Sequence, residues 1–150
     1  MVPADASIIG PLADLGVAPS DVTDVVLSHH HPDHTMRVGL FPNARVHDHW
    51  AWYRSDEWVD RPCDGFHVSD SVRLMHTPGH TRECLTTLVT TADGVAALTH
   101  LWWFEGGPKE DPHAADPAGL HSARARVLDL ATLVVPGHGA PFRPDPGTPR

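Results

Sequence analysis

The hydrophobic pattern of the chain divides it into short elements that are separated by turns rich in glycine, proline and aspartate. In the first half, helically spaced apolar residues end at Gly16, and the apolar run Val25-Val26-Leu27 indicates a buried strand. We therefore expect a helix at 7–15, a strand at 23–28, a helix at 33–40, a strand at 44–48 and a helical segment at 49–60.

The second half of the chain is typical of several strands followed by one helix and a last strand. Asp93-Gly94 between two apolar stretches strongly indicates a hairpin turn. A helix is indicated by apolar Leu120 and Val127, with Arg124 and Arg126 as polar positions. We expect strands at 72–76, 85–91, 94–99 and 133–135, a helix at 120–130, and a frayed tail at 143–150.

Four histidines and an aspartate follow the strand at 23–28, in the run Ser28-His29-His30-His31-Pro32-Asp33-His34. Neutral imidazole and carboxylate are the ligands that zinc and similar divalent ions prefer. His29 and His31 alternate along the chain, and Asp33 and His34 offer a second pair, which suits two metals better than one. The alternative is a solvated loop in a chain with 13 histidines among 150 residues. The strand directly before the motif favours a metal site.

Three histidines stand directly after apolar strands. His29 is the first, His80 ends Thr77-Pro78-Gly79-His80, and His138 lies in Pro136-Gly137-His138-Gly139. Ligands at the ends of neighbouring strands can converge on one pocket that a rigid sheet holds in place. We therefore expect these distant segments to meet in space.

Composition bounds the class of protein. A chain of 150 residues that is 41% hydrophobic fits one folded domain, residues 1–150. The net charge of −8 disfavours broad binding to nucleic acid and favours a small-molecule substrate. Cys63 and Cys84 show neither a disulfide framework nor a zinc-knuckle spacing. Without a signal peptide or an apolar run long enough for a membrane, a cytoplasmic protein is expected.

The three histidine motifs together resemble the metallo-β-lactamase superfamily in their residues, their order and their wide spacing. The resemblance covers about 21–142, and 122–142 is similar to the small single-domain hydrolases of the superfamily. The first motif also resembles that of glyoxalase II enzymes, whose separate C-terminal domain has no room here. The resemblance implies an α/β fold, the αββα sandwich.

The resemblance also implies two adjacent metal sites that together bind one or two ions. Zinc is expected, with manganese or iron as alternatives. A hydroxide held between the metals would attack an ester, thioester, amide or phosphodiester bond. Asp33 would orient that hydroxide and take up its proton. The implied ligands are His29, His31 and His80 for the first metal, and Asp33, His34 and His138 for the second. His30, between ligands, would support them or face solvent.

The chain departs from the family pattern at His100. The family usually carries an aspartate here that bridges both metals, whereas this chain has Thr99-His100. A neutral imidazole offers one nitrogen and cannot bridge two metals, and a negative charge between two dications is lost. We hypothesise that His100 binds only one metal and that the second site is weaker. The alternative is that His100 lines the pocket without touching a metal.

Few residues precede the first motif. The family normally begins with several strands before its first histidine, whereas here 28 residues precede His29 and predict a helix, a turn and one strand. We therefore expect a sandwich that lacks its first N-terminal strands and exposes an apolar sheet edge. A partner, a homo-oligomer or N-terminal truncation would account for that edge.

Two classes of function remain. One is a metal-dependent hydrolase, and the other is a catalytically weak or inactive metal-binding member, or a truncated fragment, of the superfamily. Trp102-Trp103-Phe104 either line a pocket for an apolar substrate or pack in the core. Three carboxylates are near enough in sequence to His100 to replace a missing carboxylate ligand, namely Glu105, Glu110 and Asp111. His113 lacks a ligand-like context. Substrate-binding residues cannot be assigned from the sequence.

Overall fold

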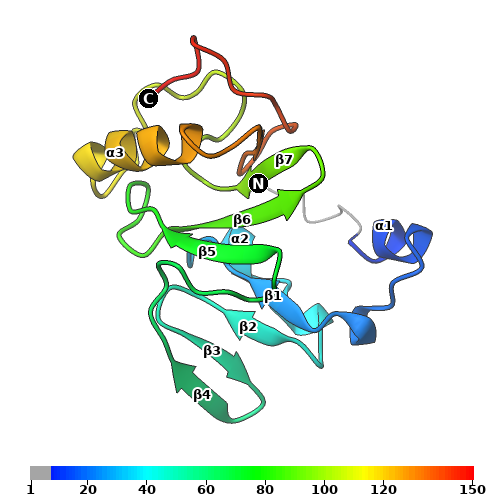
Figure 1. Cartoon of the computed structure of the whole chain (residues 1–150). Helices are drawn as coiled ribbons and strands as arrows, with labels where there is room; N and C mark the ends of the chain where they lie inside the picture. Colours follow the sequence, from blue (N-terminus) through cyan, green and yellow to red (C-terminus); the bar gives the residue numbers. More distant parts are fainter. Residues whose placement is uncertain (1–7) are drawn as a thin grey trace.

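Two four-stranded sheets form the centre of the protein in the computed structural model, which describes residues 8–150 (Figure 1). In the first sheet β1 and β2 are parallel, whereas β3 and β4 form an antiparallel hairpin on the far side of β2. The strands lie in the order β1 (Asp24–Val26), β2 (Arg45–His47), β3 (Ala51–Arg54) and β4 (Glu57–Asp60). These strands lead the chain into and away from the first histidine motif.

The second sheet confirms the predicted strands of the second half. Its order is β5 (Val72–His76), β6 (Leu85–Thr91), β7 (Gly94–Leu98) and β8 (Leu133–Val135). The β6–β7 hairpin turns at Gly94, whose φ of +114° lies in the region that favours glycine, as the Asp93-Gly94 pair predicted. β8 pairs in parallel with β7.

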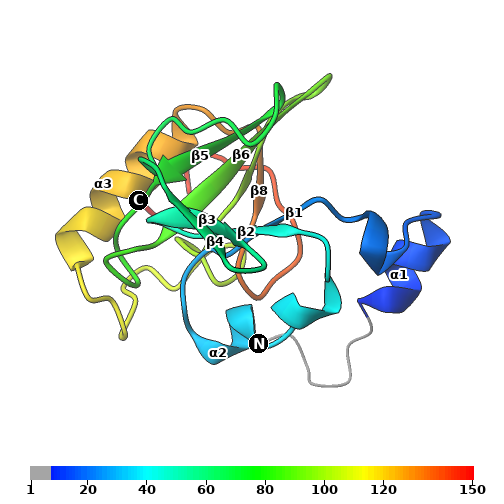
Figure 2. The ribbon, with the colours of Figure 1, turned by 90° about the horizontal axis from the view of Figure 1, so that it is seen from below.

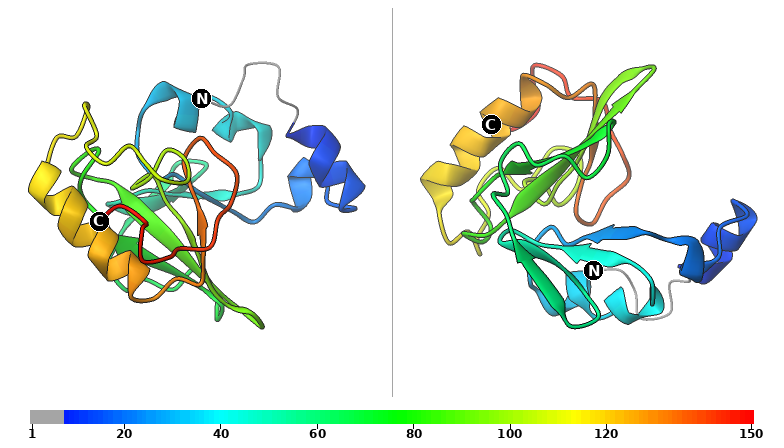
Figure 3. Two further views of the ribbon diagram at one scale, coloured as in Figure 1. Left: turned by 90° about the horizontal axis from the view of Figure 1, so that it is seen from above. Right: turned by 60° about the horizontal axis from the view of Figure 1, so that its bottom comes forward.

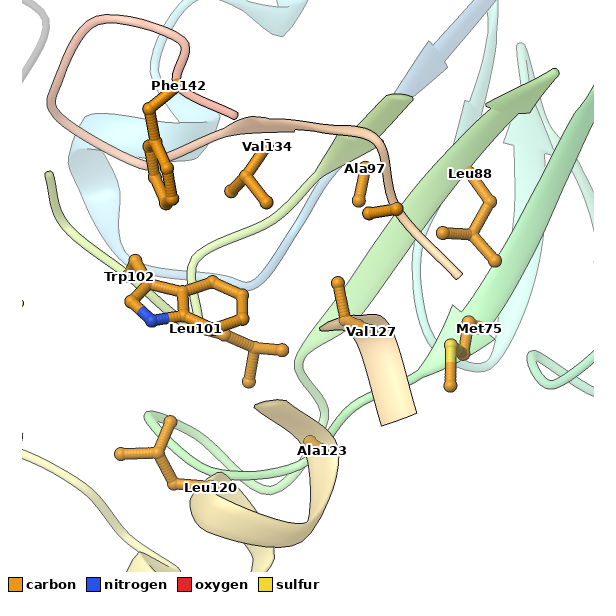
Figure 4. Close-up of a cluster of buried hydrophobic side chains, with 11 residues drawn as sticks. Met75, Leu88, Ala97, Leu101, Trp102, Leu120, Ala123, Val127, Val134 and Phe142 are labelled. Carbon is orange, nitrogen blue, oxygen red and sulfur yellow. The ribbon is translucent and has the colours of Figure 1, made fainter. Parts of the chain in front are cut away.

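Helix α3 (Pro117–Leu128) covers the outer face of the second sheet. It starts where the Asp116 carboxylate accepts a hydrogen bond from the Gly119 N–H at 2.9 Å, an N-cap that satisfies one free donor of the first turn. Figure 4 shows its apolar side chains directed at those of the sheet. The main core so formed includes Met75, Leu88, Ala97, Leu101, Trp102, Leu120, Ala123, Val127, Ala131, Val134 and Phe142.

The two sheets pack face to face through a smaller core of Cys63, Leu74 and Leu85, against which Val26 and Phe66 pack. On the side of the first sheet that faces away from the second lie helix α2 (Pro32–Thr35) and a 3-10 turn at Val38–Leu40 (Figure 3). The layers therefore follow an α-β-β-α order, which confirms the predicted fold class. No helix of residues 8–150 is long and apolar enough to cross a membrane.

The expected edge of the first sheet lies at β1, which pairs only with β2 within residues 8–150. The strand was predicted at 23–28 and as buried, whereas its three residues are only partly buried. Helix α1 (Ile9–Asp14), predicted at 7–15 with Ser7 outside the described residues, extends away from the two sheets (Figures 1 and 2). It buries none of its side chains.

The two helices expected after the first motif are corrected by the structure. Residues 49–60 form the β3–β4 hairpin, in which Trp52 lies opposite Val59 and Tyr53 opposite Trp58. Cross-strand aromatic pairs of this kind stabilise a hairpin more than they would a helix. The helix expected at 33–40 is split into α2 and the 3-10 turn, followed by Pro42.

Two further details differ from the sequence analysis. Arg124, expected on the polar face of α3, is fully buried and donates hydrogen bonds to the carbonyls of Leu101, Pro108 and Lys109 at 2.7–2.9 Å. The tail expected to fray contacts the core, because the buried Trp102 indole donates to the Pro149 carbonyl at 2.9 Å. These hydrogen bonds hold the loop that includes Leu101 to Lys109 and the C-terminal tail against the core. The apolar pattern of the sequence predicts neither contact.

Candidate metal centre

The seven proposed ligands lie at one end of the two sheets because of strand direction. β5, β7 and β8 run the same way, so His80, His100 and His138, which follow them, emerge at the same end. The Leu85 N–H donates to the Ser28 carbonyl at 2.9 Å, which joins the end of β1 to the start of β6 at that same end. The predicted convergence of distant histidine motifs is therefore confirmed.

The first three proposed ligands fit a metal ion. His29 Nε2 and His80 Nε2 each lie 3.0 Å from His31 Nδ1. One proton on His31 Nδ1 could bridge to only one of these nitrogens, whereas a cation can accept a lone pair from all three. Ligand nitrogens around a tetrahedral zinc are about 3.3 Å apart, given Zn–N distances of about 2.0 Å. The observed separations are close to that value.

The second proposed set of metal ligands includes the carboxylate of Asp33. Asp33, His34 and His138 offer ligand atoms that lie within 4.8 Å of one another. A third such set consists of His29, His34 and His100, so His100 lies within the cluster. His100 Nε2 is 3.0 Å from His138 Nε2. The structure thus brings all seven candidates together, with His100 next to ligands of both proposed metals.

Burial keeps the imidazoles at the centre in the neutral form that binds metals. It lowers the pKa of His29 to about 2 and that of His100 to about 3, with help from the positive charge that neighbouring histidines would carry. Burial also lowers the pKa of His34. His34 Nε2 and His100 Nδ1 are buried and form no hydrogen bond within the described residues. Buried polar atoms that lack a hydrogen bond are costly unless a further group satisfies them.

Glycines in the second and last motifs allow close packing around the candidate ligands. A Cβ at Gly137 would clash with His100 Cδ2. A Cβ at Gly79, directly before His80, would lie 2.8 Å from the Leu120 Cα of α3. Both motif glycines are therefore required for close packing around a candidate ligand.

The sequence analysis missed the residue that holds His80 in place. Asp111, in the loop before α3, has a side chain only 2% exposed, and its Oδ2 accepts a hydrogen bond from His80 Nδ1 at 2.7 Å. Its other oxygen accepts from the His113 N–H at 2.8 Å. Although burial raises the pKa of Asp111, these two hydrogen bonds hold it below its ordinary value. Nothing in the sequence links Asp111 to a histidine 31 residues earlier.

Two other polar contacts support the first motif. Ser28 Oγ lies 3.1 Å from His29 Nδ1, and His30 Nε2 lies 3.3 Å from Asp48 Oδ2. The His30 side chain is 42% exposed and belongs to none of the three ligand sets, as expected for a residue between ligands.

A pocket of about 580 Å³ opens onto the centre. Besides candidate ligands it is lined by Trp103 and His113, while Trp102 is a fully buried core residue and Phe104 is half-exposed. Of the two alternatives for the aromatic run, pocket lining therefore applies to Trp103 and core packing to Trp102. His113, taken as structural from the sequence, is part of the pocket wall.

A family model described as the metallo-beta-lactamase superfamily matches residues 2–139. The chain belongs to the metallo-β-lactamase superfamily. Metallo-beta-lactamase domain-containing protein 1 of Homo sapiens is 34% identical over 148 residues, which are 93% of this chain and 56% of that protein. The chain spans 56% to 62% of the length of the vertebrate relatives it matches.

Two solved structures share the fold at low sequence identity. An N-acyl homoserine lactone hydrolase with N-hexanoyl-L-homoserine bound at its catalytic metal centre has a TM-score of 0.65 and 22% identity, over 88% of this chain and 62% of that one. TTHA1623 in a di-iron-bound form has a TM-score of 0.66 and 21% identity, over 94% and 81% of the two chains. The superfamily consists of metallo-hydrolases, and the histidine clusters of this chain can bind metal.

Proposed function

We propose that the chain is a metal-dependent hydrolase of an ester, thioester, amide or phosphodiester bond, with zinc as the metal and manganese or iron as alternatives. The observation that carries the proposal is the pair of 3.0 Å separations that join His29 Nε2 and His80 Nε2 to His31 Nδ1. Three imidazole nitrogens at this spacing can all bind one cation, whereas a single proton on His31 Nδ1 could join only two of them. The di-iron form of TTHA1623 keeps iron among the candidates.

In this proposal His29, His31 and His80 hold one metal, and Asp33, His34 and His138 hold the other. A bound dication would lower the pKa of a water molecule toward neutrality and polarise the oxygen of the bond to be cleaved. Asp33 lines the pocket, its carboxylate 3.9 Å from His138 Nε2, where it can orient the attacking water and accept its proton. For an ester, the water oxygen becomes part of the acid and the C–O bond to the alcohol breaks.

The substrate and the compartment belong to the same proposal. Because the net charge is −8, we favour a small molecule over nucleic acid. Cys63 and Cys84 are both free and buried, which suits the reducing cytoplasm.

Turnover that depends on metal tests the function. Zinc- or manganese-loaded protein should cleave a generic ester, a lactam or a bis-aryl phosphodiester, and a chelator should abolish cleavage. His31→Ala should lower kcat/KM at least about 100-fold, because it removes the nitrogen that His29 and His80 share. His121→Ala, an exposed histidine outside the centre, serves as the control. Bound metal without turnover on the whole panel would favour the alternative, a metal-binding member without catalysis.

Metal stoichiometry tests the role proposed for His100. We expect one tightly held metal per chain and a second, weaker one, because one imidazole nitrogen cannot bridge two cations. His100→Asp should raise the tightly held metal to two, since a carboxylate offers an oxygen to each cation and adds a negative charge. His121→Asp adds the same charge at an exposed site and should change nothing. Metal analysis after dialysis decides, and two tight metals in the unmutated protein would contradict the proposal.

A further inference from the structure

Two residues of the pocket have no ligand role, Trp103 and His113. Their rings are parallel to within 9° and their centroids are 5.9 Å apart, within the range of offset aromatic stacking. The Trp103 ring also lies edge-on to those of His80 and His138, at centroid distances of 6.2 Å and 6.5 Å. This aromatic wall, Trp103 and His113, therefore begins directly beside the proposed metal ligands.

The aromatic wall is fixed in place by the backbone on both sides. The Trp103 N–H donates to the Gly107 carbonyl at 3.1 Å, and the Trp103 carbonyl accepts from the His138 N–H at 2.8 Å. The His113 N–H donates to Asp111, which also holds His80. A surface that is already ordered loses little conformational entropy when a ligand binds to it.

The charges around the aromatic wall restrict what can bind. Among the described residues that line the pocket there is no lysine or arginine, and Asp33 is the one carboxylate. Away from the proposed metals, a carboxylate or phosphate on the part of the substrate beside the wall would find no cationic side chain to pair with. The net charge of −8 also disfavours anionic ligands.

We propose that Trp103 and His113 recognise an uncharged planar ring next to the bond that is cleaved. The inference rests on the proposed hydrolytic function and assigns its substrate to neutral esters, thioesters or amides that carry an aryl or similarly flat ring. Stacking requires a flat π-face, which a saturated ring of similar size lacks. Nucleobases could also stack, but their phosphates would find no basic side chain in this pocket.

Binding of two matched amides tests the inference without turnover. Benzamide is flat and neutral, and cyclohexanecarboxamide has the same polar group on a saturated ring. We expect benzamide to bind the full chain about three- to tenfold tighter, with and without zinc, when followed by the indole N–H resonances in NMR titrations. Trp103→Leu should reduce the ratio to about one. Trp103→Phe, which keeps a flat ring, should retain most of it and controls for loss of fold.

A tryptophan outside the pocket provides the matched control. Trp58 on β4 is 55% exposed, and Trp58→Leu should leave the ratio unchanged. Equal binding of the two amides, or a preference that persists in Trp103→Leu, would overturn the inference. Tighter binding of adenosine monophosphate than of benzamide to the chelated protein would also overturn it, in favour of a nucleotide. The preference for benzamide can be measured in chelated protein, where no hydrolysis is needed. If the protein prefers benzamide but hydrolyses no substrate, the proposed hydrolytic function is refuted and the role of Trp103 and His113 in binding a flat ring stands.

Discussion

Replacing Asp111 by asparagine is expected to weaken metal binding about 10- to 100-fold, the usual cost of losing the group that orients a ligating histidine. The carboxylate accepts a hydrogen bond from His80 Nδ1 at 2.7 Å. That contact keeps the proton on Nδ1 and leaves the Nε2 lone pair directed at the centre. A neutral amide at this position removes the negative charge and can turn its NH2 group toward the ring. Competition with a coloured chelator measures the change in affinity.

The neighbouring carboxylate provides the control for Asp111. Glu110 is 82% exposed, and Glu110→Gln removes the same charge one residue away. We expect its metal affinity to equal that of the unmutated protein. If both variants lost affinity equally, the effect would come from overall charge, and Asp111 would have no positioning role.

Replacing Arg124 by methionine is expected to lower the free energy of unfolding by about 4 kcal/mol, which corresponds to a fall in Tm of roughly 8–16 °C. The guanidinium is fully buried and donates to three carbonyls of the segment that carries Trp103. Methionine fills much of the same volume but leaves those carbonyls without a donor. Urea unfolding of metal-free protein measures the change without a contribution from bound metal.

Arg126 is the matched control on the same helix. Its side chain is 48% exposed and interacts with the His76 carbonyl and with Asp64. Arg126→Met should therefore change stability by less than about 1 kcal/mol, as is usual for exposed ion pairs. A loss for Arg124→Met no larger than for Arg126→Met would show that the buried hydrogen bonds contribute little.

The sequence predicted the strands that lead to the histidine motifs, and it predicted their convergence. Apolar runs that end in turn residues, as at Leu133–Val135 before Pro136, are a local pattern. The β3–β4 hairpin was mistaken for a helix because Trp52 and Trp58 gain their stability from cross-strand partners. Such partners depend on pairing, which a single sequence does not reveal.

The groups that support the ligands could not be predicted for a related reason. Asp111 and Arg124 act across 31 and 15 or more residues, through contacts that have no spacing rule. His113 became part of the pocket because Asp111 fixes its backbone. Residue type alone leaves such a histidine indistinguishable from a surface one.

The division of the proposed ligands between the two sheets has a thermodynamic consequence. One group of ligands, within His29 to His34, follows β1 of the first sheet, and the other group follows strands of the second sheet. A metal ion that is coordinated by ligands from both groups reaches its full affinity only after the two halves of the sandwich have docked. The free energy of metal binding would then stabilise the docked sandwich relative to any form in which the two halves have separated.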